Sequence, residues 1–311
     1  MARNEDGTPA SRWLELKATV DRESVDDVAA IMGHFGKSGA VIEEIPSPQG
    51  TQRDGDLTVK VYLPEDSTLP REKARLLEAL GHLSMICPIP IQEQPLSQED
   101  WLKAWKALFA ARRVGKRLVI KPPELDYRAR EGDVIVEINP GMAFGTGLHP
   151  TTQLCLQELE RKLNPGAEVL DLGTGSGIQA IAAARLGAGR VLALDTDPEA
   201  VRAAQANILA NGLDAVVAVG PGTLPHPSAT GPFDLVVANI TAGVIGEKAE
   251  SLVGALKPGG TLIAGGILAD RVVEVGARLG GAGGRVIRRR SRGGWRTLVV
   301  APTIHLREAI T

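Results

Sequence analysis

The chain of 311 residues is 43% hydrophobic and 23% charged, and its formal net charge is −2 at pH 7. This composition and length predict a globular protein of about two domains, and a charge so near zero gives no reason to expect stable nucleic-acid binding. The two cysteines, Cys87 and Cys155, exclude a disulfide framework. No apolar run is long enough to span a membrane, and the residues after Met1 lack the apolar core of a signal peptide. We therefore expect a cytoplasmic protein.

Residues 1–95 predict a small α+β domain. Apolar and polar side chains alternate over 12–20, as in a half-buried strand, and apolar positions at helical spacing follow. The predicted elements are, in order, a strand at 12–20, a helix at 21–39, strands at 40–45 and 57–63, a helix at 69–83 and an edge strand at 87–92. This order is typical of a ferredoxin-like fold, although a fold alone does not say what the domain binds.

Residues 96–112 predict a linker helix between two domains. Ser97 fits an N-cap, because acidic residues follow it in the first helical turn. Trp101 and Trp105 are four residues apart and therefore share one face of this helix. We interpret them as packing between the domains; an aromatic platform for the substrate is the alternative.

Residues 113–311 predict a larger α/β domain. Strands at 117–121 and 134–138 are expected to form an antiparallel leading element, followed by a glycine-containing loop and a helix that ends near Leu163. Strand and helix then alternate at 167–172, 178–187, 190–195, 198–212, 215–219, 234–240, 243–256, 260–265 and 270–280, before strands at 285–290 and 296–301. This alternation predicts a parallel sheet with helices on both faces, and the last two strands predict an antiparallel hairpin.

A glycine-rich turn follows the first strand of this alternating series. Asp171 ends the apolar run, and Gly173, Gly175 and Gly177 lead into an alanine-rich helix. Such a turn lets a backbone approach a ligand closely, and the helix start offers free N–H groups to it. The dinucleotide fingerprint G-x-G-x-x-G would need glycine at Ile178, and no Gly-Lys-Ser/Thr follows as in a P-loop. The turn therefore predicts a nucleotide-like cofactor that is neither a dinucleotide nor a nucleoside triphosphate.

Two later polar residues also end predicted strands. Asp195 ends the second strand of the series, where a carboxylate can accept hydrogen bonds from both hydroxyls of a ribose. Asn239 lies near the end of the strand at 234–240. Open α/β sheets bind ligands at the carboxyl ends of their strands, so Asp171, Asp195 and Asn239 together predict one site. Each position also has a structural interpretation, with Asp171 and Asp197 as caps and Asn239 as a strand end.

Three segments resemble the signature sequences of the PrmA family of ribosomal protein methyltransferases. They are PGMAFGTGLHPTT at 140–152, DLGTGSGI at 171–178 and ANITA at 238–242. Stretches at 39–44, 100–105 and 115–120 extend the resemblance over nearly the whole chain. The resemblance implies a Rossmann-like class I methyltransferase domain over residues 113–311, with a seven-stranded, mostly parallel sheet and an antiparallel last strand. The ferredoxin-like domain at 1–95 would then recognise the substrate.

In that family the cofactor is S-adenosylmethionine, so the resemblance implies methylation of lysine ε-amino and N-terminal α-amino groups of a large-subunit ribosomal protein. It implies that Thr152, Gly173, Asp195 and Asn239 bind the cofactor, and Gly175 would let the backbone pass close to its methionyl part. Thr152 follows a predicted helix start, where a carboxylate can be held. We expect no metal, no membrane contact, no stable nucleic-acid partner and a monomeric protein.

Methyl transfer from a sulfonium is an in-line displacement that needs a neutral amine. A free lysine has a pKa of about 10.4, so only a small fraction is neutral at pH 7 unless desolvation lowers that pKa. An amide is not a strong base, but the Asn239 carbonyl can orient the amine N–H and aim its lone pair at the methyl group. Such positioning can supply about 7–11 kcal/mol of a barrier. We therefore expect Asn239 to act without a protein general base, and the proton to leave to water.

Three features near these segments keep two interpretations each. Phe144 either packs in the core or forms a lid on the adenine or sulfonium of the cofactor. His149, beside Pro150, is interpreted as a hydrogen-bonding loop residue in preference to a base. Arg288–Arg290 is interpreted as a solvated strand edge, with contact to ribosomal RNA as the alternative.

Two other functions compete with protein methylation. A small-molecule or RNA amine methyltransferase could use the same catalytic core, and a nucleotide-binding regulator could retain the fold without activity. In nucleic-acid amino methyltransferases an aromatic residue follows the asparagine and stacks on the base, whereas Ile240, Thr241 and Ala242 follow Asn239 here. This sequence favours a flexible amine over a flat base.

Overall fold

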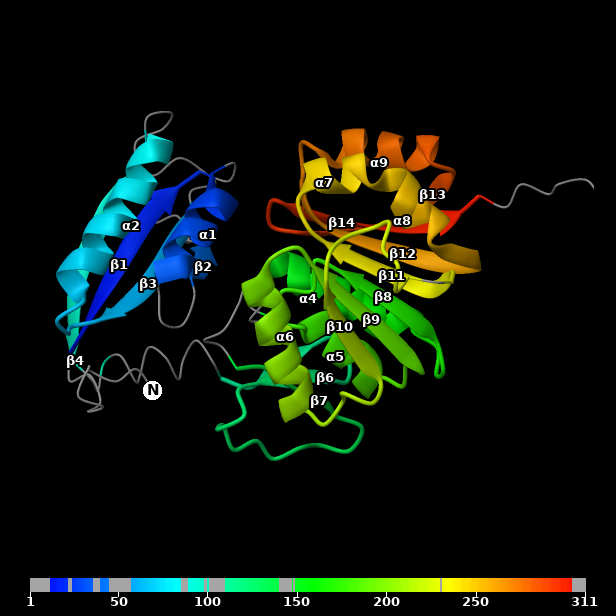
Figure 1. The fold of residues 1–311 in the computed structure, drawn as a ribbon, viewed down its shortest axis with the longest axis horizontal. Helices are drawn as coiled ribbons and strands as arrows, with labels where there is room; N and C mark the ends of the chain where they lie inside the picture. The colour runs from blue at the N-terminus through cyan, green and yellow to red at the C-terminus, as the bar shows by residue number, and fades with distance from the viewer. Residues whose placement is uncertain are drawn as a thin grey trace, which may run out of the picture. The chain divides into compact units, whose positions relative to one another are not determined.

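The computed structural model describes residues 12–21, 24–35, 40–44, 57–84, 89–97, 100, 110–139, 147, 149–229 and 231–303. The chain separates into two compact units, Met1–Ala110 with Pro140–Phe144, and Ala111–Asn139 with Gly145–Thr311. Figure 1 labels the helices and strands of both units. No helix within the described ranges is long and apolar enough to cross a membrane.

The first unit contains the predicted strand and helix order. Its elements are β1 (Arg12–Val20), α1 (Val25–Phe35), β2 (Val41–Glu44), β3 (Leu57–Pro64), α2 (Leu69–Ser84) and β4 (Ile91–Ser97). The strands form an antiparallel sheet in the order β2-β3-β1-β4 (Figure 1). Apolar residues of β1, β3, α1 and α2 are buried, among them Leu16, Val61, Met32 and Leu80. The sheet order and connections are those of the expected ferredoxin-like fold.

The last strand of this sheet differs from the prediction. The sequence predicted a strand at 87–92, but β4 begins at Ile91 and continues to Ser97. Pro90 offers no N–H to the sheet and only its carbonyl accepts a hydrogen bond, from Thr19 at 3.1 Å. Pro95 is tolerated inside β4 because that strand lies at the sheet edge, as predicted.

Ser97 makes hydrogen bonds of the kind expected of the predicted cap, and the predicted helix after it, apart from Asp100, lies outside the described residues. Its Oγ atom accepts a hydrogen bond from the backbone N–H of Asp100 at 3.1 Å and donates one to the Asp100 carboxylate at 2.8 Å. Trp101 and Trp105 lie outside the described residues, so both interpretations of this pair remain predictions, as do the domain boundaries at 96–112.

A three-stranded sheet opens the second unit. It consists of β5 (Arg112–Val114), β6 (Leu118–Lys121) and β7 (Val134–Glu137), in that order. β5 and β6 are antiparallel, but β6 and β7 are parallel, so the prediction of antiparallel leading strands at 117–121 and 134–138 is wrong. Parallel neighbours need a crossover of about a dozen residues, and residues 122–133 form this connection.

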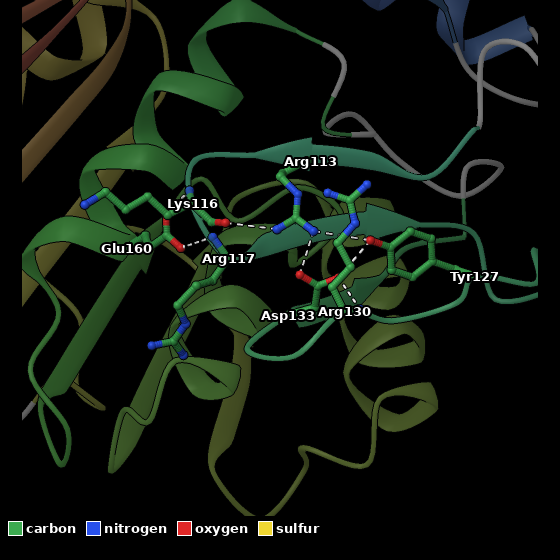
Figure 2. A network of polar contacts seen from close by, with 7 residues as sticks. All are labelled: Arg113, Lys116, Arg117, Tyr127, Arg130, Asp133 and Glu160. Carbon is green, nitrogen blue, oxygen red and sulfur yellow. Dashed lines mark hydrogen bonds and ion pairs between the residues drawn. The ribbon is translucent and has the colours of Figure 1, made fainter.

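Asp133 holds this crossover in place (Figure 2). Its carboxylate accepts hydrogen bonds from the backbone N–H of Arg130 at 2.9 Å, from Arg113 at 2.6 Å and from the Tyr127 hydroxyl at 2.8 Å. The Arg130 N–H, together with Arg113 and Tyr127, lowers the pKa of Asp133 to about 2. The carboxylate therefore stays charged. It joins β5, through Arg113, and the crossover, through Tyr127 and Arg130, to the start of β7.

A seven-stranded sheet forms the centre of the second unit. Its strands are β8 (Glu168–Leu172), β9 (Arg190–Asp195), β10 (Val217–Pro221), β11 (Phe233–Asn239), β12 (Leu256–Leu268), β13 (Gly284–Arg292) and β14 (Trp295–Pro302). They lie in the order β10-β9-β8-β11-β12-β14-β13. The first five are parallel neighbours, and β14 is antiparallel to both β12 and β13. The predicted parallel sheet with a closing antiparallel hairpin is confirmed.

Helices cover both faces of this sheet (Figure 1). One layer contains α4 (Pro150–Lys162), α5 (Ile178–Arg185) and α6 (Pro198–Ala210), and the other α7 (Ala242–Glu247), α8 (Ala249–Gly254) and α9 (Val272–Gly281). Strand residues alternate between the layers: Val169 packs with α4 and α5, and Leu170 with α8 and α9. The single helix predicted at 243–256 is wrong, because the chain leaves helical geometry at Lys248.

Candidate active site

Three polar side chains meet the carboxyl edge of adjacent strands. Asp171 is the penultimate residue of β8, Asp195 ends β9 and Asn239 ends β11. These strands are neighbours in the order β9-β8-β11. Parallel strands bring their carboxyl ends to the same edge of a sheet. The structure therefore brings together the three strand-end residues that the sequence singled out.

The glycine turn is built around Asp195. Gly173 and Gly175 have φ values of 73° and 55°, which is left-handed geometry that favours glycine. The Asp195 carboxylate accepts the backbone N–H of Gly175 at 2.9 Å through Oδ2 and that of Asp197 at 3.0 Å through Oδ1. A carboxylate can accept about four hydrogen bonds, so both oxygens keep lone pairs for a ligand's hydroxyl groups. Asp197 caps α6 through the N–H of Glu199 at 2.8 Å, as one interpretation predicted.

Asp171 lies beneath the turn and is fully buried. It accepts hydrogen bonds from the Thr174 hydroxyl at 2.7 Å and from the backbone N–H of Ala180 at 3.1 Å, both to Oδ2. Burial raises the pKa of Asp171 to about 7, against the opposing effect of these two hydrogen bonds. Its cap-like role is therefore confirmed, and the side chain supports the turn from inside the unit.

The raised pKa predicts a specific pH dependence of stability. Between about pH 4 and pH 7 the folded protein holds a proton on Asp171 that the unfolded chain releases, so the free energy of unfolding falls as pH rises across this interval. Asp171→Asn cannot titrate, and its stability relative to the wild type should rise with pH over the same range. Urea unfolding of both proteins without cofactor, at several pH values, measures this difference. A difference that does not change with pH would contradict a raised pKa.

Asn239 contacts the first turn of α4. Its Nδ2 atom donates to the Oγ1 atom of Thr152 at 3.4 Å, and Thr152 is almost fully buried. The Oδ1 atom of Asn239 is buried and has no hydrogen-bond partner among the described residues. A buried carbonyl oxygen without a partner is costly, so this atom is suited to accept an N–H from a bound molecule.

His149 caps the same helix. Its Nδ1 atom accepts the backbone N–H of Thr151 at 3.4 Å and lies 2.7 Å from the Thr151 hydroxyl oxygen. The ring packs edge-on against Trp295, with ring centroids 4.7 Å apart. Burial lowers the pKa of His149 to about 4, so the ring is neutral near pH 7 and is a weak base. The interpretation of His149 as a hydrogen-bonding residue is confirmed.

Arginines of β13 hold α4 against the sheet. Glu158 of α4 has a fully buried side chain, and its carboxylate contacts Arg161 at 2.6 Å, Arg290 at 2.8 Å and Arg288 at 3.3 Å. Arg292 donates to Gln153 on the same helix. The interpretation of Arg288–Arg290 as a solvated strand edge is confirmed in part, because β13 is the edge strand and Arg288 and Arg289 are exposed. Arg288 and Arg290 also pair with Glu158 on a helix far earlier in the sequence, which the sequence alone could not indicate.

Glu160 fastens α4 on another side (Figure 2). Its carboxylate accepts the backbone N–H groups of Lys116 at 2.7 Å and Arg117 at 2.6 Å, in the turn between β5 and β6. The helix that carries Thr152 is thus attached both to β13 and to the three-stranded sheet.

Sequence reasoning missed Asn207, which is buried on α6. Its Nδ2 donates to the Ser176 carbonyl in the glycine turn at 2.8 Å, and its Oδ1 accepts the N–H of Asn139 at 3.1 Å. It ties the turn to the residue that precedes the segment at 140–148. An asparagine inside a helix gives no signal of these distant partners in a single sequence.

Phe144 lies outside the described residues, so its role stays a prediction. Across the ranges that the structure describes, no group of three or more His, Cys, Asp or Glu side chains is arranged to hold a metal ion.

The sheet order, the glycine turn and the polar strand ends define the class I methyltransferase fold. A family model described as ribosomal protein L11 methyltransferase (PrmA) matches residues 12–303. The chain belongs to this family.

Individual relatives agree with the family match. A ribosomal protein L11 methyltransferase of Pelotomaculum thermopropionicum is 44% identical over 91% of this chain and 96% of its own length. One from Chloroflexus aurantiacus is 42% identical over 92% of this chain and 97% of its own. A crystal structure of ribosomal protein L11 methylase from Lactobacillus delbrueckii subsp. bulgaricus aligns with a TM-score of 0.56 and 31% identity, over 62% of this chain and 99% of that one.

Proposed function

We propose that this protein transfers methyl groups from S-adenosylmethionine to lysine ε-amino and N-terminal α-amino groups of a large-subunit ribosomal protein, in the cytoplasm. The family match supports a ribosomal protein as substrate. The observation that carries the choice of an amine is the Oδ1 atom of Asn239, which is buried, without a partner among the described side and main chains, and at the carboxyl edge of the sheet. Asn239 is the residue that would contact the reacting amine.

Residues of the glycine turn and of α4 fit the cofactor. Asp195 has lone pairs left for the two ribose hydroxyls, and Gly173 and Gly175 present a backbone without side chains. Thr152 lies in the first turn of α4, where the positive end of the helix dipole favours the methionyl carboxylate. Asn239 borders the same position through its contact with Thr152. Phe144 would complete the site, either from the core or as a lid. When bound, the cofactor supplies an electrophilic methyl group.

The reaction then depends on how the amine is held. The amine must be neutral to attack, and the Asn239 carbonyl would accept one of its N–H groups and direct its lone pair. His149 is a poor proton acceptor because burial lowers its pKa to about 4. We propose that no side chain acts as a general base and that the proton leaves to water after transfer. The rate should then rise with pH as the amine loses its proton.

The first unit is proposed to bind the substrate. Residues 1–95 would recognise the ribosomal protein, residues 96–112 would form the linker, and residues 113–311 would bind S-adenosylmethionine, in a monomeric protein without a stable nucleic-acid partner. The relatives match over both units, which supports a function that needs both.

Labelled S-adenosylmethionine tests this function directly. Incubation of the full-length protein with the cofactor and separated ribosomal proteins, or with ribosomal RNA, should place the label in one large-subunit protein, on lysine and the N-terminus. Label in RNA or in a small molecule would support the alternative amine methyltransferase on the same core. An absence of transfer despite cofactor binding would support a nucleotide-binding regulator and contradict the proposal.

A further inference from the structure

Gly265 lies beside Asn239 on the neighbouring strand β12. In the parallel pairing of β11 with β12, Asn239 is opposite Gly265. Gly265 is buried, and the pairing of β12 with β14 shifts register between Ala264 and Ile267. Such irregularities next to active sites change the direction in which side chains point. The local backbone of β12 therefore forms part of the surroundings of Asn239.

The missing side chain of Gly265 leaves space that two other residues use. A Cβ atom at this position would lie 2.8 Å from the Asn239 Oδ1 atom and would overlap the Sγ atom of Cys155 on α4. Real Cβ atoms essentially never approach other atoms so closely, so either neighbour would have to move. Gly265 is not among the glycines with positive φ, so the backbone itself accepts alanine and the obstacle is contact alone.

The two ends of the Asn239 amide have different surroundings. Its nitrogen donates to Thr152, and its oxygen lies against the space above Gly265. Cys155 is fully buried three residues after Thr152 on the same helix, and burial raises the pKa of its thiol to about 12. Cys155 is therefore a neutral, unreactive packing residue that closes this space from the α4 side.

We propose that Gly265 is a positioning residue for methyl transfer, because the space left by its missing side chain sets the direction of the Asn239 carbonyl and so the place of the amine. The inference rests on the proposed role of Asn239. A methyl group at residue 265 would turn or shift the carbonyl, and displacement of a reacting group by about 1 Å can cost about 100-fold in rate.

Three variants separate this role from simple packing. Gly265→Ala should lower both the melting temperature and kcat, because the added methyl group meets Cys155 and Asn239. Cys155→Ala should retain kcat and serves as the control. In Gly265→Ala/Cys155→Ala the contact with sulfur is gone, so the melting temperature should return close to that of Cys155→Ala. Its kcat should stay at least about tenfold lower, with KM and the affinity for S-adenosylhomocysteine little changed. Recovery of kcat together with stability would overturn the inference.

Asn239→Ala in the Cys155→Ala background completes the test. If Gly265 acts through Asn239, adding Gly265→Ala to this variant should cause no further loss of residual kcat, whereas independent effects would multiply. Multiplying effects would overturn the inference and leave the role of Asn239 intact. Full kcat in Asn239→Ala would instead refute the amine-orienting role of Asn239, on which the inference rests.

Discussion

Asn239→Ala is expected to lower kcat by at least about 100-fold, because the variant loses the only group proposed to orient the amine. A smaller loss of affinity for S-adenosylhomocysteine is also expected, because Asn239 is predicted to border the cofactor and its Nδ2 atom donates to Thr152 at 3.4 Å. Single-turnover methylation of the ribosomal protein measures the chemical step, and calorimetry measures the affinity.

Asn239→Asp is the matched variant for this experiment. It keeps an oxygen acceptor of the same size at the end of β11 and should lose less activity than the alanine variant. An alanine variant with normal kcat, or an aspartate variant as impaired as alanine, would contradict an orienting role for the carbonyl. Melting temperatures of both variants check that the fold is retained.

Asp195→Ala is expected to weaken binding of S-adenosylmethionine by about 100-fold or more. Two hydrogen bonds from ribose hydroxyls to a charged carboxylate are worth about 1.5–3 kcal/mol each, and 1.4 kcal/mol corresponds to a factor of ten. The variant also loses the acceptor for the Gly175 N–H, which would loosen the glycine turn. Isothermal titration with the cofactor measures the change.

Asp197→Ala supplies the control for Asp195, because the two carboxylates are two residues apart and differ in role. Asp197 is exposed and caps α6, so its loss should cost about 1 kcal/mol of stability with little change in affinity. Equal loss of affinity in both variants would show that the effect arises from the loop as a whole and not from a ribose contact.

The predictable parts of the fold are those that local patterns determine. The glycine turn after Asp171 could be predicted because a strand, left-handed glycines and a helix start leave a clear order of residues. The layers of the large sheet follow from alternation of strand and helix. The capping role of Asp197 depends only on neighbours within three residues and is confirmed, and Ser97 makes the expected hydrogen bond with the Asp100 N–H.

The parts that could not be predicted depend on distant partners. The parallel pairing of β6 with β7 is decided by the path of residues 122–133, which Asp133 fixes. Glu158 contacts Arg290 from 132 positions away, so the sequence shows only a run of arginines, and the pairing of two of them with Glu158 is visible only in the fold. For the same reason the sequence indicated Asn239 but not Gly265. The proposed effect of Gly265 depends on the space that its missing side chain leaves beside Asn239, and only the fold brings these two residues together.

The attachment of α4 has a consequence for a substrate with several target amines. Glu158 joins this helix to β13 through a partly buried ion pair with Arg290, and Glu160 joins it to the turn between β5 and β6 through two backbone N–H groups. A partly buried ion pair is screened by salt less than an exposed one. We therefore expect the helix that carries Thr152 to stay fixed against the sheet, so that the Asn239 amide beside it keeps one orientation. If Asn239 orients the amine as proposed, each target amine would have to be brought in turn to that one orientation. We expect the order of modification to follow from how the substrate is presented, and not from rearrangement of the catalytic unit.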